Sequence, residues 1–215
     1  EINDPFEDLN RDIFAFNEKL DEKFLKPTAL VYRKVTPQFA RTGVTNFFNN
    51  LEEIDTTINQ VLQGEIKYAF NDAGRFLLNT TFGLFGLIDV ASKMGLERHE
   101  EDFGQTLGVW GVSSGPYIML PFLGPSNPRD LMSRPISSFL SGTFAMEDND
   151  LKFTLVGIDA LETRERLLDA ETLIIGDKYM FVKDAYVQSR EYEINNGTTE
   201  DDVFLDDMDD IFGDN

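Results

Sequence analysis

The sequence predicts a mostly α-helical protein, with a single helical domain over residues 1–196 and an acidic tail over 197–215. Apolar residues recur at helical spacing in the front half of the chain and again in its last third. Between these parts lies a long uncharged stretch with too many Gly and Pro residues for a regular helix. At 215 residues, the chain is long enough to bury a core.

The first predicted helix begins near Asp4 and Pro5, because an acidic residue followed by proline is typical of a helix start. We expect Pro27 to end this helix, since proline lacks the amide hydrogen that a helix interior uses. Its apolar residues are spaced by four, three and four positions and therefore share one face: Leu9, Ile13, Phe16 and Leu20.

Three further helices are predicted over 37–48, 51–64 and 65–80, and we expect them to pack on one another through short turns. Gly64 is suited to a left-handed residue just past the end of the second of these helices. The apolar residues of that helix again share one face: Ile54, Ile58, Val61 and Leu62.

The middle of the chain has 26 consecutive residues without a charge, from Phe103 to Pro128. That length would cross a bilayer core, which takes roughly 20 apolar residues as a helix. Five Gly and four Pro residues argue against a regular spanning helix. The glycines instead favour a hairpin or re-entrant loop around Trp110, with 116–120 as its second arm: Gly108, Gly111 and Gly115.

The last third predicts three more helices, over 126–142 with a kink at Pro135, over 151–169 and over 177–194. In the second of these we expect Leu155, Ile158 and Leu161 to face inward. Its charged residues are expected to face outward: Glu162, Arg164, Glu165 and Arg166. The tail carries apolar residues at helical spacing that are suited to docking on a partner: Phe204, Met208, Ile211 and Phe212.

The formal net charge is -20, and residues 197–215 contribute eight acidic side chains with no Lys or Arg. Nucleic acid is therefore an unsuitable partner, because phosphate binding needs a basic surface. The absence of Cys excludes disulfides, thiolate catalysis and Cys-bound metals. No signal peptide is visible, so we expect a processed or shortened form of a longer protein.

A second glycine-spaced apolar segment lies within 79–96 and raises the question of what it contacts. It contains Phe82, Leu84, Phe85, Leu87 and Ile88, with Gly83 and Gly86 among them. One interpretation is a buried core in which helices approach closely; the other is that these side chains face lipid. The nearby long uncharged loop favours lipid, since a soluble core would have difficulty hiding both stretches.

Candidate catalytic and metal motifs are weak. Residues 111–115, "GVSSG", match the nucleophile elbow of serine hydrolases with Ser113 as nucleophile, but Pro116 and a strand-like run follow where a helix is required. His99, the single histidine, precedes Ser113, whereas that fold places it downstream; we expect a solvated side chain. One His without Cys makes no zinc site, so we predict no metal, and no motif indicates a cofactor.

Several long stretches together resemble the MlaA (VacJ) lipoproteins of the Gram-negative outer membrane. They extend through most of the chain, and the acidic tail is the weakest part of the match. The stretches are "NDPFEDLNRDIFAFN", "VTPQFARTGVTNFFNNLEE", "INQVLQG", "RFLLNTTFGLFGLIDVA", "EDFGQTLGVWGVSSGPYIMLPFLGPSNPRD" and "ETRERLLD". The family's lipidated N-terminal Cys is missing here, so the anchor is inferred to lie before Glu1.

The resemblance implies an all-helical ring in the periplasmic leaflet of the outer membrane, bound to a porin trimer. A central polar channel would let misplaced phospholipids pass toward a periplasmic carrier of the MlaC type. The family's channel-lining loop maps onto Gly108, Trp110, Gly111, Ser113, Gly115 and Tyr117, with Ser113 where the family has a glycine.

The implied role is not enzymatic. The resemblance also implies that Gly83 and Gly86 let neighbouring helices approach closely, and that the apolar residues of the 79–96 segment form a band that faces lipid or packs within the ring: Phe82, Leu84, Phe85, Leu87 and Ile88.

Other family positions follow from the same resemblance. Asn46 and Phe47 fall in a segment that influences the channel state, and Lys152 aligns with a basic position near the channel. Lys152 would attract a lipid phosphate, although a plain surface lysine is an equally good interpretation. The alternative function is an envelope adaptor that joins a porin to a carrier without conducting lipid.

Overall fold

The computed structural model describes residues 3–140 and 148–195, and it is mostly helical, as the sequence predicts. The tail candidates Phe204, Met208, Ile211 and Phe212 lie outside the described residues. The helices in chain order are α1 (Glu7–Leu20), α2 (Lys26–Val35), α3 (Gln38–Gln63), α4 (Ile66–Phe82), α5 (Val90–Lys93), α6 (Phe103–Val109), α7 (Pro128–Leu140), α8 (Asn149–Ala170) and α9 (Lys178–Ile194).

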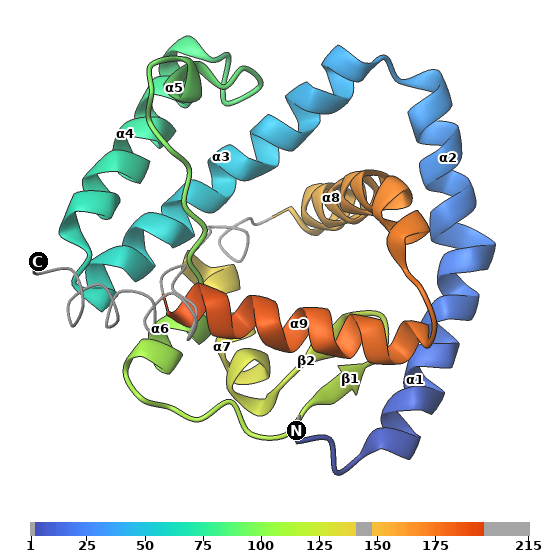
Figure 1. The fold of residues 1–215 in the computed structure, drawn as a ribbon. Helices are drawn as coiled ribbons and strands as arrows, with labels where there is room; N and C mark the ends of the chain where they lie inside the picture. Colours follow the sequence, from blue (N-terminus) through green and yellow to red (C-terminus); the bar gives the residue numbers. More distant parts are fainter. Residues whose placement is uncertain (1–2, 141–147, 196–215) are drawn as a thin grey trace, which may run out of the picture.

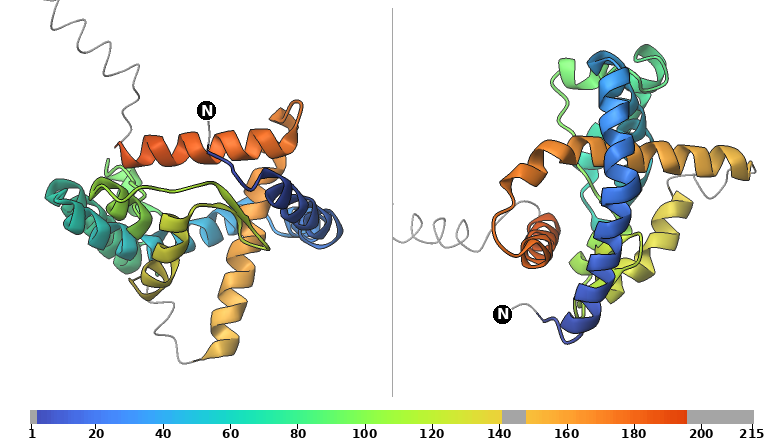
Figure 2. Two further views of the ribbon diagram at one scale, coloured as in Figure 1. Left: turned by 90° about the horizontal axis from the view of Figure 1, so that it is seen from below. Right: turned by 90° about the vertical axis from the view of Figure 1, so that its right-hand side faces the viewer.

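The helices form a ring-like frame (Figure 1), in agreement with the predicted fold class. α1 and α2 follow one another along one side, α3 runs diagonally away from α2, α4 returns beside α3, and α9 crosses the lower part of the frame above α7 and β1. α8 projects out of this frame, nearly perpendicular to α9, as Figure 2 shows.

The predicted end of the first helix at Pro27 is wrong, because the chain continues from α1 into α2 without a break. A π-helical turn, Asp21–Leu25, joins the two helices, and Pro27 lies in the first turn of α2. The Lys26 amide donates to the Asp21 carbonyl, five residues back, so the turn is widened just before the proline. The wider turn accommodates a residue that lacks an amide hydrogen inside a long helix.

The two helices predicted over 37–48 and 51–64 are a single helix, α3, of 26 residues. Its end is as predicted: Gly64 adopts the left-handed conformation with φ 85°. The predicted helices over 65–80 and 126–142 correspond to α4 and α7, and α7 contains Pro135 in its interior.

The polarity of the described residues is inverted relative to an ordinary soluble protein. Twenty polar or charged residues are buried, whereas only seven apolar residues are, and three of these are alanines. Many large apolar side chains are exposed instead, among them Phe39 at 80%, Phe70 at 77% and Phe153 at 71%. Exposed apolar surface of this extent indicates contact with a membrane or with another protein.

Polar side chains, rather than the predicted apolar face, join α3 to α4. Gln60 Nε2 donates to Asp72 Oδ2 at 2.6 Å, and Arg75 Nε donates to Glu53 Oε1 at 2.8 Å. Asn50 Nδ2 donates to Thr80 Oγ1 at 2.9 Å and makes a third rung of this polar ladder. The apolar faces of both helices are consequently free to point outward: Val61 and Leu62 on α3 are 52% and 40% exposed.

The predicted orientation of the 151–169 helix is wrong in the same way. Glu162 and Glu165 of α8 are buried, and Ile158 is 40% exposed. Arg33 of α2 donates to Glu165 at 2.5 Å, and Thr45 of α3 donates to Glu162 at 2.5 Å. α8 therefore packs on α2 and α3 through charge, which apolar periodicity alone does not reveal.

The long uncharged stretch is only partly the predicted hairpin. Its first part is the helix α6, which an Asp102–Gln105 capping box begins. The hairpin lies further on, where β1 (Ile118–Leu120) pairs antiparallel with β2 (Gly124–Ser126). The predicted second arm is thus its first strand, and a small aromatic core forms where Tyr117 and Met119 meet Tyr179 of α9.

In residues 3–140 and 148–195, no helix combines the length and the apolar character that crossing a bilayer requires. The exposed apolar side chains are instead distributed over the outer faces of several amphipathic helices.

Candidate functional site

The segment 82–88, which follows α4, presents all five of its large apolar side chains to the outside. The exposed fractions are 69% for Phe82, 61% for Leu84, 77% for Phe85, 45% for Leu87 and 40% for Ile88. This exposure contradicts the buried-core interpretation, and contact of these side chains with lipid stays a prediction.

The backbone holds this exposure at an energetic cost. Leu84 and Phe85 have φ values of 54° and 59°, in the left-handed region that costs an L-residue about 1–2 kcal/mol. Backbone hydrogen bonds fix the turn, including Gly86 N to Asn79 O at 2.9 Å and Ile88 N to Gly83 O at 2.8 Å. The turn therefore holds two large apolar side chains outward in spite of its backbone strain.

The two glycines are needed for this turn. A Cβ on Gly83 would lie 2.1 Å from the carbonyl oxygen of Ile88, and one on Gly86 would lie 2.6 Å from Asn50 Cβ on α3. Only Gly86 therefore serves the close approach of neighbouring elements that the sequence suggests for both.

The channel-state candidates lie beside this turn. Asn46 Nδ2 donates to the Leu87 carbonyl at 3.2 Å, and the Phe47 ring packs edge-on against Phe48 at 5.4 Å. Asn46 thereby connects α3 directly to the apolar segment.

The loop candidates fall into two groups. Gly115 and Tyr117 line a cavity of about 500 Å³ between the loop and α9. Trp110 is 54% exposed and donates from Nε1 to the Leu62 carbonyl at 3.2 Å, while Gly111 and Ser113 are exposed. Gly108 lies behind the cavity wall, and a Cβ there would come within 2.9 Å of Arg129 Nη1.

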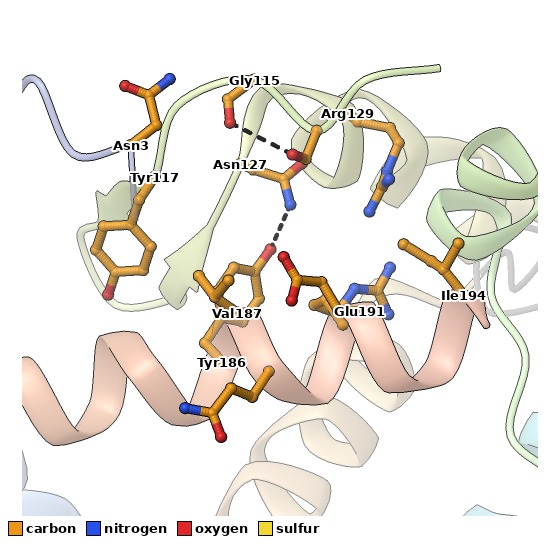
Figure 3. A pocket seen from close by; sticks show the side chains of 12 residues that line it. Asn3, Gly115, Tyr117, Asn127, Arg129, Tyr186, Val187, Glu191 and Ile194 are labelled. Atoms are coloured by element: carbon orange, nitrogen blue, oxygen red, sulfur yellow. Dashed lines mark hydrogen bonds between the residues drawn. The ribbon is translucent and has the colours of Figure 1, made fainter. Parts of the chain in front are cut away.

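The cavity is polar and charged on its α7 and α9 sides (Figure 3). Arg129 enters from the first turn of α7, and Glu191 rises from α9 to face it. Tyr186 lies deeper, where its hydroxyl bonds to Asn127 Nδ2 at 2.8 Å.

Asp130 organises the charges around the cavity. It accepts from Tyr186 Oη at 2.6 Å, from Arg190 Nε at 2.8 Å and from Arg129 Nε at 3.0 Å. Burial raises the pKa of Asp130, but the hydrogen bond from Tyr186 and the charge of Arg190 outweigh burial and hold that pKa below its ordinary value. The site therefore keeps a fixed carboxylate under two arginines.

Lys152 lies apart from this cavity. It belongs to the first turn of α8, the end of that helix farthest from α9 in Figure 2, and it is not among the residues that line the cavity.

The hydrolase interpretation of Ser113 lacks its framework, because a helix, α6, precedes it and a strand, β1, follows it, the reverse of a nucleophile elbow. His99 is not simply solvated as expected. Its Nδ1 lies 2.8 Å from Asp72 Oδ2, and its ring contacts the Tyr68 ring in a tilted arrangement with the centroids 4.6 Å apart, so it belongs to the polar ladder of α3 and α4.

Comparison with known proteins agrees with the earlier resemblance. The family model described as "MlaA lipoprotein" matches residues 2–193. The chain belongs to the MlaA lipoprotein family. The intermembrane phospholipid transport system lipoprotein MlaA of Escherichia coli K12 is 39% identical over 206 residues, which cover 90% of this chain and 79% of the relative. Its Haemophilus influenzae counterpart is 33% identical over 210 residues, covering 92% and 81% of the two chains.

A solved structure of this kind, published as "Structural basis for maintenance of bacterial outer membrane lipid asymmetry", superposes with a TM-score of 0.78 at 36% identity. It covers 89% of this chain and 98% of its own. The ring-like helical fold is therefore that of the MlaA family.

Sequence reasoning missed the cavity residues Arg129, Tyr186 and Glu191. Arg129 is the first charge after the 26-residue uncharged stretch, and that position was a usable signal for a functional charge. Tyr186 and Glu191 gave no comparable signal, because they reach the cavity only when α9 packs across the loop in the folded structure.

Proposed function

We propose that this chain acts in phospholipid transport at the outer membrane, the role that the names of its MlaA relatives give to those proteins. More specifically, it removes phospholipids misplaced in the outer leaflet and passes them through a polar channel to a periplasmic lipid carrier. This activity would maintain lipid asymmetry. The chain would sit in the periplasmic leaflet, next to a porin trimer.

The inverted polarity of the fold is the observation that carries this proposal. Within residues 3–140 and 148–195, twenty polar or charged residues are buried, while Phe39, Phe70, Phe85 and other apolar side chains face outward. An apolar exterior suits contact with acyl chains, and a charged interior gives a lipid head group polar partners along its path. No step in such a passage requires covalent chemistry.

The alternative is an adaptor that joins a porin to a carrier without conducting lipid. The two proposals separate in a transfer assay with the full chain and porin reconstituted in vesicles and a soluble carrier outside. Gly111→Glu should reduce lipid flux while the porin still co-purifies. Gly95→Glu is the matched control, since Gly95 and Gly111 have φ values of 84° and 88° and open space around a Cβ. Unchanged flux in Gly111→Glu, with porin retained, favours the adaptor.

The acidic segment 197–215 is proposed to dock the carrier through Phe204, Met208, Ile211 and Phe212. Deletion of 197–215 should weaken binding of the carrier to the reconstituted chain. Equal affinity of the shortened and full chains would remove this part of the proposal.

A further inference from the structure

The cavity between the loop and α9 contains a buried cation with an unused donor. The Arg129 side chain exposes only 4% of its surface, and its Nη2 has no hydrogen-bond partner among the described residues. Its other nitrogens are engaged: Nε donates to Asp130 at 3.0 Å, and Nη1 reaches the Val112 carbonyl at 3.5 Å. A buried charged donor without a partner is costly, so an anion that this nitrogen reached by a small shift of the arginine side chain would relieve that cost.

A carboxylate faces this arginine across the cavity. Glu191 on α9 is exposed and points into the same space (Figure 3), and no hydrogen bond or ion pair engages its carboxylate in residues 3–140 and 148–195. The neighbouring Arg190 does not neutralise it, because its guanidinium is taken up by Asp102, Asp130 and Glu193 at 2.8 to 3.1 Å.

Among the described residues, the cavity therefore has on one wall a guanidinium nitrogen without a partner, on an arginine that Asp130 already pairs, and on the opposite wall an unpaired carboxylate. A purely anionic ligand would be attracted by Arg129 and repelled by Glu191. A zwitterion that carries a phosphate and an ammonium satisfies both. The volume of about 500 Å³ exceeds what a small head group needs and lies within the usual range of ligand sites.

We propose that this cavity is a head-group site selective for amine-bearing zwitterionic phospholipids of the phosphoethanolamine type. Arg129 Nη2 donates to the phosphate, and the ammonium donates to the Glu191 carboxylate. Gly108 permits the arginine to lie against α6, because a Cβ there would come within 2.9 Å of Nη1. This inference rests on the proposed function in phospholipid transport and names the lipid class that the chain prefers.

The test measures binding of phosphatidylethanolamine and phosphatidylglycerol to the full chain in detergent micelles by native mass spectrometry. Wild type should prefer phosphatidylethanolamine by about tenfold, the effect expected of one charge-assisted hydrogen bond that is partly exposed. Glu191→Gln should abolish this preference, and Glu191→Lys should invert it. Asp184→Asn, on α9 but away from the cavity lining, changes the net charge equally and should leave the preference intact.

Arg129→Gln should weaken the binding of both lipids to a similar extent. Since Arg129 is buried, circular dichroism is used to check that the variant protein folds. The Glu191 variants keep the test decisive even if that variant unfolds. Soluble glycerophosphoethanolamine should compete poorly with the lipid. Competition as strong as that of the lipid would assign the site to a water-soluble phosphate compound and overturn the proposal.

The outcomes separate the two levels of inference. If both lipids bind and the ratio of their affinities is the same in wild type and Glu191→Gln, the head-group assignment fails and the transport function stands. If wild type binds neither lipid, the proposed function fails together with the assignment.

Discussion

Replacing Phe85 by asparagine should weaken membrane binding without disturbing the fold. Phe85 exposes 77% of its surface and has a φ of 59°. Asparagine tolerates the left-handed conformation better than phenylalanine does, so the turn over 82–88 should form at least as readily. The change therefore removes an apolar contact while keeping the backbone.

The size of the effect follows from the exposed fraction. Full transfer of a phenylalanine side chain from water is worth about 1.5–3 kcal/mol. Because 77% of the residue is available for that transfer, the loss should be roughly 1–2 kcal/mol, or about 5- to 30-fold in partition. Flotation of the 215-residue chain with phosphatidylcholine vesicles measures this partition directly.

The control is Tyr192→Asn, because Tyr192 is 53% exposed on α9, which lies across the frame from the 82–88 segment (Figure 1). Its partition should stay within about twofold of wild type, since the proposed lipid contact is on the other side. If Phe85→Asn floats as wild type does, or if both variants lose equally, the assignment of 82–88 as the lipid-facing segment is refuted.

Three stability predictions follow from the interior, each measured by chemical denaturation in detergent. Gly86→Ala should lose roughly 2–4 kcal/mol because its Cβ would lie 2.6 Å from the nearest atom at a φ of 93°, whereas Gly95→Ala, in open space, should lose only about 1. Arg75→Met should cost about 3–5 kcal/mol by leaving the buried Glu53 without a hydrogen bond and with only the more distant Arg98 Nε, 3.9 Å away, as a partner; adding Glu53→Leu should recover part of this loss, and an additive loss would contradict it. Burial raises the pKa of Glu101 to about 7, above its unfolded value, so stability should fall as the pH rises from 5 to 8. Glu101→Gln should reduce this fall by on the order of 1–2 kcal/mol, and an unchanged pH profile would rule out the assignment.

The element boundaries could be predicted wherever a local residue decides them. Gly64 ends α3 because only a residue that tolerates φ 85° fits there. Pro27 misled the prediction because a π-helical turn, which depends on five-residue hydrogen bonding, has no strong sequence signature. Phe103–Val109 is a helix because the Asp102–Gln105 capping box begins it. The prediction missed this helix because the glycines of the uncharged stretch favoured a loop.

The direction in which each helix faces could not be predicted from periodicity. The spacing of Ile54, Ile58 and Val61 defines a face but does not say whether that face contacts protein or lipid. The deciding information is pairwise: Glu53 finds Arg75, and Asp72 finds Gln60 only when α4 folds back on α3. The apolar segment 82–88, by contrast, could be predicted as a unit because its glycines and aromatic residues are contiguous.

The polar ladder and the apolar exterior are two aspects of one physical arrangement. In water, an apolar interior would be the main source of stability, and buried pairs such as Glu53–Arg75 would contribute little net free energy. Beside acyl chains, apolar faces gain nothing by leaving lipid for one another, so hydrogen bonds and ion pairs must hold the helices in register. Arg75→Met should therefore lower the free energy of unfolding, whereas Phe85→Asn should lower the partition into membranes and leave the free energy of unfolding unchanged. In a soluble protein stabilised by an apolar core, replacing an exposed phenylalanine would change neither quantity, and the large losses of stability would come from replacing buried apolar residues.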